Sequence, residues 1–193
     1  MLIVFEGIDR SGKTTQCGML RDFLQRHHSK VTALKHPDRT APYVGPLISD
    51  YLAKKIDPSP AAGSLLLSAS LWTTADQLRK VQKDDSQHFI LLDRYVWTNI
   101  AYSMQRGMLR EVMEKICEDL PIPDLTIYLK SVPEDISQRE GFGEELFDQI
   151  AFQRGVSAIM DDITLQTTWP VLVVDSNGSI DSIHQTILGH LNL

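Results

Sequence analysis

The stretch GIDRSGKT at residues 7–14 decides the fold, because it fits the phosphate-loop pattern G-x-x-x-x-G-K-S/T and directly follows the apolar run Leu2–Phe5. The glycines allow a tight turn from a strand into a helix, with backbone N–H groups that point inward. The start of the following helix adds partial positive charge at the same place. The stretch therefore predicts a strand, a phosphate-binding loop and a helix, with a nucleoside triphosphate as the ligand. The alternative is a chance match in an ordinary loop.

Apolar runs separated by helical patterns continue from this stretch to the end of the chain. This alternation is typical of a parallel sheet with helices on both faces, a three-layer α/β architecture. The predicted strands are Leu2–Phe5, Val31–Leu34, Phe89–Leu92, Leu125–Leu129 and Val171–Val174. Because 193 residues suit one compact domain, we expect residues 1–193 to form a single domain. Its ligands should then lie beyond the carboxyl ends of the strands.

Proline and glycine positions predict where two helices begin and where a lid lies. One helix is predicted from Pro60 toward Lys83, and another begins near Pro133. The glycine-flanked segment 141–143 interrupts the second helical pattern, which resumes over residues 144–162. Two helices joined by such a segment indicate a short lid, which we place at residues 139–147.

Composition limits the partners of the chain. The 25 Asp and Glu residues outnumber the 19 Lys and Arg residues, for a formal charge of -6, which disfavours sequence-independent binding to nucleic acid. Cys17 and Cys117 lie far apart and lack metal-ligand spacing, so we expect free thiols of a reducing compartment. No run approaches the length of a membrane span. We therefore expect no nucleic acid or membrane partner and a cytoplasmic location, with the nucleus as the open alternative.

A second cluster of charges follows the third predicted strand. Asp93 can face Mg²⁺ through water, and the guanidinium fork of Arg94 can hold a phosphate group with two hydrogen bonds. Arg39 follows the second strand and can contact the same anion from the other side. Taken singly, these residues could be a strand-end ion pair and a solvated loop charge. Their position at the same edge as the phosphate loop favours a second phosphate site.

Charged residues inside the loop suggest how a phosphoryl group could be transferred. Lys13 should reach the β- and γ-phosphates, and the Thr14 hydroxyl should reach Mg²⁺. Arg10 could lie over the transferring group and stabilise its charge, unless it simply faces solvent. Asp9 should point away from the phosphates, toward an acceptor hydroxyl or an arginine, because like charges repel. A strong base is not required, since phosphoryl transfer depends mainly on alignment and charge neutralisation.

Ordered motifs along nearly the whole chain resemble those of thymidylate kinases. Residues 5–16, FEGIDRSGKTTQ, are similar to the opening of that family, and residues 93–95 resemble its DRY element. Similar motifs follow at 123–125, 139–145 and 174–180. The resemblance implies the P-loop nucleoside monophosphate kinase fold, with a five-stranded parallel sheet, and Mg²⁺-dependent transfer from ATP to dTMP. It also implies a homodimer.

The resemblance assigns residues to each part of the site. Catalytic roles are implied for Asp9, Arg10, Lys13 and Arg94. Contacts with ATP are implied for Gly7, Asp9, Arg10, Ser11, Gly12, Lys13, Thr14, Thr15, Arg139 and Asn177. Contacts with the acceptor are implied for Asp9, His36, Arg39, Leu67, Leu71, Arg94, Tyr102, Phe147 and Gln153, and contacts with the metal for Thr14 and, through water, Asp93. A basic residue in the loop and none in 141–145 is similar to the subtype whose catalytic arginine lies on the phosphate loop.

The largest departure from the family pattern lies where the base of the acceptor should bind. Many members carry an aromatic residue and, four positions later, an arginine, where this chain has Leu67 and Leu71. Both leucines should lie on one helical face, but Leu71 cannot donate a hydrogen bond to a base carbonyl, a loss of about 1–3 kcal/mol. His36 could supply a compensating contact. We expect a looser pyrimidine site that accepts dUMP, unless both leucines are core residues and the motif is shifted by one turn.

Three alternatives remain open. The chain could be a nucleotide-dependent switch, a degenerate kinase that binds ATP without acceptor turnover, or a kinase for another deoxynucleoside monophosphate. A guanine-specific N-K-x-D run is missing, and the paired arginines favour transfer to a second nucleotide.

Overall fold

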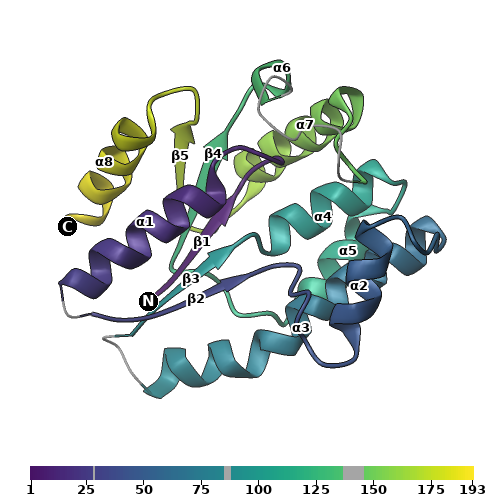
Figure 1. Cartoon of the computed structure of the whole chain (residues 1–193), viewed down its shortest axis with the longest axis horizontal. Coiled ribbons are helices and arrows are strands. Elements are labelled where there is room, and N and C mark those ends of the chain that lie inside the picture. Colours follow the sequence, from purple (N-terminus) through teal and green to yellow (C-terminus); the bar gives the residue numbers. More distant parts are fainter. Residues whose placement is uncertain (28, 85–87, 137–145) are drawn as a thin grey trace.

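A computed structural model describes residues 1–27, 29–84, 88–136 and 146–193. All five predicted strands are confirmed, and they form one parallel sheet in the order β2-β3-β1-β4-β5 (Figure 1). Their bounds are β1 (Leu2–Glu6), β2 (Lys30–Lys35), β3 (His88–Asp93), β4 (Leu125–Lys130) and β5 (Val171–Asp175). Strand β1 pairs with β3 on one side and β4 on the other, and all its residues are buried. The phosphate-loop motif therefore starts from the centre of the sheet.

Helices cover both faces of the sheet, so the predicted three-layer architecture is confirmed (Figure 1). The helices are α1 (Lys13–Arg26), α2 (Val44–Leu52), α3 (Pro60–Asp84), α4 (Val96–Gln105), α5 (Arg110–Cys117), α6 (Pro133–Ile136), α7 (Ile150–Gln166) and α8 (Ile180–Leu191). Strand residues alternate between the two layers, as the pleat requires. Leu2 and Val4 pack in one core cluster with α3, α4, α5 and α7, whereas Ile3 and Phe5 pack in another with α1 and α8.

The predicted helix after the lid begins later than the sequence pattern indicated. The pattern suggested residues 144–162, but residues 146–149 are not helical and α7 begins at Ile150. The reason lies in two contacts: Phe147 stacks on Phe152, and the buried Asp148 carboxylate pairs with Arg10. An extended backbone at Gln149 allows both contacts. Most of the predicted lid at 139–147, with Arg139, lies outside the described residues.

The carboxylate of Glu6 joins the end of β1 to the start of α4. One of its oxygens accepts hydrogen bonds from the backbone N–H groups of Tyr95 and Trp97, at 3.1 and 2.9 Å. The other accepts from the N–H and the hydroxyl of Thr98. Burial raises the pKa of Glu6, and the hydrogen bonds from Thr98 oppose that shift. These contacts fix α4 beside the phosphate loop.

Cys17 and Cys117 are both free and buried. Burial raises the pKa of the Cys17 thiol to about 12 and that of Cys117 to about 11. None of the helices within the described residues is long and apolar enough to cross a bilayer.

Candidate active site

The loop between β1 and α1 has the backbone geometry that anion binding requires. Gly7 has a φ of 149°, and a Cβ there would lie 2.7 Å from the carbonyl oxygen of Leu129, so no larger residue fits. Gly12 has a φ of 94° and precedes the first residue of α1. No side chain caps this helix start and its first turn carries no acidic residue. Its N–H groups are therefore free to bind phosphate oxygens.

Lys13 is folded back onto the loop, and its ammonium group contacts atoms of the loop itself. The Nζ atom donates to the carbonyl oxygen of Ile8 at 2.5 Å and to Ser11 Oγ at 3.1 Å. Burial lowers the pKa of Lys13 to about 7, and repulsion from Arg94 adds to that shift. The loop therefore holds a lysine whose charged form becomes more favourable once an anion arrives.

Asp93 and Thr14 form a group that fits a divalent cation. The Thr14 hydroxyl donates to Asp93 Oδ2 at 2.5 Å, and the other carboxylate oxygen is buried without a hydrogen-bond partner among the described residues. A buried acceptor of this kind is costly unless a cation or water completes it. No group of three or more His, Cys, Asp or Glu side chains that could hold a metal ion occurs in the described ranges. Mg²⁺ beside substrate phosphates requires only one or two protein ligands, so the pair is sufficient.

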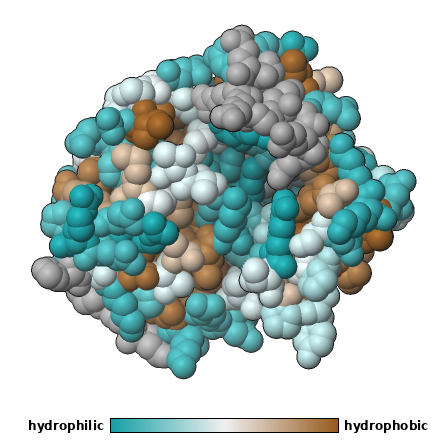
Figure 2. Space-filling model, in the orientation of Figure 1, coloured by the Kyte–Doolittle hydropathy of each residue, from teal (hydrophilic) through white to brown (hydrophobic). Residues whose placement is uncertain are grey.

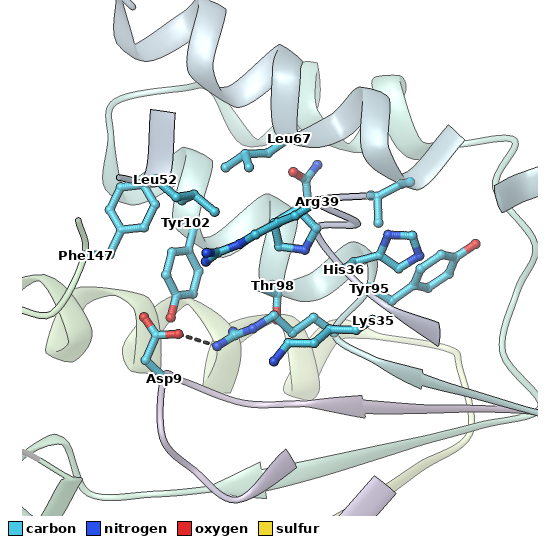
Figure 3. A pocket seen from close by; sticks show the side chains of 14 residues that line it. Asp9, Lys35, His36, Arg39, Leu52, Leu67, Tyr95, Thr98, Tyr102 and Phe147 are labelled. Atoms are coloured by element: carbon cyan, nitrogen blue, oxygen red, sulfur yellow. Dashed lines mark hydrogen bonds and ion pairs between the residues drawn. The ribbon is translucent and has the colours of Figure 1, made fainter. Parts of the chain in front are cut away.

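Asp9 and Arg94 form an ion pair at the centre of the site (Figure 3). Gln153 Nε2 donates to the second carboxylate oxygen of Asp9 at 2.7 Å, and the Tyr102 hydroxyl donates to Gln153 Oε1 at 3.3 Å. The Arg94 guanidinium lies 5.7 Å from the centre of the Tyr102 ring. Burial alone would raise the pKa of Asp9, but Arg94 and Lys13 outweigh it and lower the pKa. Asp9 is therefore a carboxylate that orients the arginine.

One pocket opens from this ion pair toward α2 and α3. It is lined by Asp9, Lys35, His36, Pro37, Arg39, Leu52, Leu67, Leu71, Arg94, Tyr95, Thr98, Asn99, Tyr102 and Phe147. Arg39 extends across it from the segment after β2, opposite Tyr102 and Phe147 (Figure 3). Leu71 is only 2% exposed, so it belongs to the core and to the pocket wall at once. Leu67 lines the same wall, which favours the unshifted motif.

His36 offers this pocket a neutral imidazole. Burial lowers its pKa to about 4. The ring nitrogens lie 3.5 Å from Ser70 Oγ and 3.3 Å from Thr74 Oγ1, both on α3. The side chain therefore bears no charge at neutral pH and is held by α3.

A second pocket follows the phosphate loop along α1. Hydrophilic residues lie in the hollow on this side of the molecule (Figure 2). Its lining is Asp9, Arg10, Ser11, Gly12, Lys13, Thr14, Thr15, Gln16, Lys35, Arg94, Asp148, Ser176, Gly178, Ile180 and Ile183. Arg10 lies 3.3 Å from the Asp148 carboxylate. Asn177, expected beside the nucleotide, is exposed and is not part of this lining, although its neighbours Ser176 and Gly178 are. Arg139 lies outside the described residues.

The two pockets meet, because Asp9, Lys35 and Arg94 line both of them. An anion bound by the phosphate loop and an anion bound by Arg39 would face each other across these three side chains. This arrangement suits transfer of a group between two ligands.

The comparisons with known proteins agree with this geometry. The family model described as "Thymidylate kinase" matches residues 5–187. The chain belongs to the thymidylate kinase family. It is therefore an enzyme of the nucleoside monophosphate kinase type, as the sequence motifs predicted.

Thymidylate kinases from distant organisms are similar over nearly their whole length. The enzyme of Schizosaccharomyces pombe is 34% identical, with 97% of this chain and 89% of the relative covered. The Homo sapiens thymidylate kinase is 32% identical, and the match covers 96% of this chain and 87% of the human enzyme. The solved structure of the thymidylate kinase from Candida albicans is similar to this chain, with a TM-score of 0.82 and 31% sequence identity. The match covers 99% of this chain and 90% of the Candida albicans chain, and that enzyme is reported with broad substrate specificity.

No role in the site was predicted from the sequence for Lys35, Asn99 or Asp148, although all three line its pockets. Lys35 pairs with Asp93 in the register of β2 and β3, and its polar side chain directly after an apolar run was a usable signal. Asn99 lies three residues before Tyr102 on α4, so the helical period placed it on the same face. Asp148 had no such signal, because its partner Arg10 is 138 residues away.

The pKa of Lys13 predicts proton uptake when the chain binds ATP. The lowered value of about 7 means that most chains carry a neutral amine at about pH 8, and bound phosphate restores the ammonium form. ATP binding should take up close to one proton per chain at about pH 8 and almost none at about pH 6. Calorimetric titration in two buffers with different ionisation enthalpies measures the uptake. A Lys13→Arg variant, whose charge is permanent, is the control, and equal uptake at both pH values would contradict the prediction.

Proposed function

We propose that the chain transfers the γ-phosphoryl group of ATP to dTMP, with Mg²⁺, to give dTDP and ADP. The observation that carries this proposal is the meeting of the two pockets at Asp9 and Arg94. A nucleotide-dependent switch needs only the phosphate-loop pocket. The second pocket, with Arg39 at its mouth and apolar walls, has the size class and chemistry of a site for a nucleoside monophosphate.

On the donor side, the loop N–H groups and Lys13 bind the β- and γ-phosphates of ATP. Thr14 would hold Mg²⁺ directly and Asp93 would hold it through water, which would use the carboxylate oxygen that lacks a partner among the described residues. A metal ion held by these two residues would supply charge neutralisation for the phosphates and help to orient the phosphoryl group. Arg10, anchored by Asp148, extends over the transferring group and stabilises the charge on its equatorial oxygens.

On the acceptor side, Arg94 and Arg39 bind the phosphate of dTMP from opposite walls. Asp9 keeps the Arg94 fork in place and retains acceptor capacity for the sugar 3′-hydroxyl. Gln153 holds the second oxygen of Asp9, and Tyr102 supports both Gln153 and Arg94. The acceptor phosphate is already a nucleophile, so the site aligns it with the γ-phosphorus without a general base.

The base of the acceptor meets a wall that selects weakly among pyrimidines. Leu67 and Leu71 offer apolar contact but no donor for a base carbonyl. Asn99 contributes an acceptor, because its Nδ2 donates to Ser68 Oγ at 2.9 Å while its Oδ1 has no partner among the described residues. Thymine and uracil both carry an N3–H that could satisfy this oxygen. These contacts support a broadened site that accepts dTMP and dUMP, and the broad substrate specificity reported for the Candida albicans enzyme gives that proposal a precedent.

A coupled ADP-release assay with ATP and Mg²⁺ tests the proposed reaction. We expect turnover with dTMP, and an Arg94→Ala variant should lose about 100-fold or more in kcat/KM, because both the acceptor phosphate and Asp9 lose their partner. Arg21→Ala, at an exposed position on α1 that lines neither pocket, is the matched arginine control. ATP hydrolysis that needs no acceptor would support the switch, and tight ATP binding without any turnover would support the degenerate kinase.

The same assay measures the acceptor range. One methyl group in an apolar pocket changes kcat/KM by about 10–200-fold. The ratio of kcat/KM for dTMP to that for dUMP should not exceed this range. The cytosine of dCMP lacks the N3–H that Asn99 could accept, so dCMP should be poorer than dUMP. Undetectable dUMP turnover, or a dCMP rate equal to that of dTMP, would contradict this acceptor site. The assay includes dGMP, because preference for a purine would indicate another deoxynucleoside monophosphate kinase.

We also propose that the chain acts in the cytoplasm, with the nucleus as the alternative, and that it has no nucleic acid partner. Two buried free thiols suit a reducing compartment. The formal charge of -6 disfavours binding to a polyanion.

A homodimer completes the proposal. Leu65 and Trp72 lie seven residues apart on α3 with exposed fractions of 50% and 38%, and Trp72 Nε1 donates to Ile116 of the neighbouring α5. Val112 of α5 is also exposed, so the two helices present one apolar face to a second copy. Sedimentation velocity should show a dimer that Leu65→Asp converts to a monomer. Leu165→Asp, at an exposed position on α7, should leave the dimer intact, and an unchanged Leu65→Asp dimer would place the interface elsewhere.

A further inference from the structure

Lys35 is the third residue that lines both pockets, and the mechanism above gives it no role. Asp9 and Arg94, the other two, are bound to each other. The side chain of Lys35 extends from the end of β2 into the same space as that ion pair (Figure 3). It is 63% exposed, so its ammonium group is accessible to a ligand in either pocket.

The contacts of Lys35 place its ammonium group at the residues that would hold the metal. Its Nζ donates to Thr14 Oγ1 at 3.4 Å and lies 3.7 Å from Asp93 Oδ2. Parallel pairing of β2 with β3 sets Lys35 directly opposite Asp93, so the backbone fixes this position. In the enzyme without ligands, the lysine therefore supplies the positive charge that balances Asp93.

A metal ion bound by Thr14 and Asp93 would repel that ammonium group, because two cations cannot share the same ligands at such short distances. Lysine carries its charge on a flexible four-carbon stem, and the contact at 3.4 Å is a weak one. Once both nucleotides are bound, the anions nearest to the Lys35 ammonium group would be the phosphates beside Asp9 and Arg94. The ammonium group can reach them by rotation of its side chain, since it already lines that space.

We propose that Lys35 is a catalytic residue whose ammonium group leaves Thr14 and Asp93 when the metal–nucleotide complex binds, and then contacts the transferring phosphoryl group. This inference rests on the proposed function. During transfer, the bond between the γ-phosphorus and the β,γ-bridging oxygen breaks, and its electron pair stays on ADP. The new bond forms from an oxygen of the acceptor phosphate. Lys35 gives up no proton, and it stabilises negative charge on the equatorial oxygens.

Three other cations of the site are more constrained than Lys35. Arg10 lies against the Asp148 carboxylate, Arg94 against Asp9, and Lys13 is buried in the loop. Lys35 adds a mobile charge at the place where the two pockets join. A lysine in that position can follow the phosphoryl group as it moves from donor to acceptor, whereas a fixed guanidinium serves one position.

Substitution of Lys35 tests the catalytic role. In the coupled assay, Lys35→Met should lower kcat by about 100-fold while each KM changes by less than about threefold, because the contact belongs to the transition state. Lys35→Arg retains the charge and should recover most of the rate. Lys80→Met, an exposed lysine on α3 that lines neither pocket, is the control. A kcat within about threefold of the wild type, or a loss confined to KM, would overturn the proposal.

A binding measurement without turnover tests the displacement from the metal ligands. The affinity for a non-hydrolysable ATP analogue is measured at a series of Mg²⁺ concentrations. In Lys35→Met the Mg²⁺ concentration at half-maximal affinity should fall by about tenfold, because the competing ammonium group is gone. An unchanged midpoint would also overturn the proposal. If the wild-type enzyme phosphorylates a monophosphate and Lys35→Met does so at the same rate, only the role proposed for Lys35 is wrong. If the wild-type enzyme phosphorylates no monophosphate, the proposed function itself is wrong.

Discussion

One buried carboxylate joins the two segments of the chain that carry the central residues of the site. Glu6 ends β1, and its oxygens accept from the backbone N–H groups of Tyr95, Trp97 and Thr98 at the start of α4. Buried N–H groups at a helix start are costly without acceptors, so this contact stabilises α4 and fixes its position beside the phosphate loop. Arg94 comes just before that helix with a φ of 74°, and the fixed helix start holds it in this unusual conformation, directed at Asp9. The segments after β1 and β3 therefore form one rigid unit.

Charges on that unit are paired before any ligand arrives. Asp9 balances Arg94, Asp148 balances Arg10, and Asp93 has Lys35 and Thr14 beside it. A site prepared in this way needs little reorganisation when phosphates enter, which is the main electrostatic advantage of an enzyme over water. This arrangement lowers the free energy of unfolding, because several of these charged groups are buried. The central sheet, with β1 buried on both faces, supplies the stability that such a site requires.

Local sequence patterns predicted the fold well, and the reason is visible in the strands. Each apolar run became a strand, but each strand continues for one polar residue more, as at Glu6 and Asp93, since ladder hydrogen bonds involve the backbone and not the side chain. The phosphate loop was predictable because its residues are consecutive. Contacts between distant segments were not: Glu6 is 89 residues from Tyr95, and Arg10 is 138 residues from Asp148. The late start of α7 depends in part on that second contact, which no local pattern could indicate.

The two buried thiols have a practical consequence for work on this molecule. With pKa values of about 12 for Cys17 and about 11 for Cys117, almost no thiolate is present at neutral pH, and the sulfur atoms are shielded as well. Thiolate is the reactive form toward oxidants and alkylating reagents. The two native cysteines of the folded chain should therefore react very little with maleimides. A single cysteine introduced on the surface could carry a fluorophore or a spin label without removal of either native cysteine.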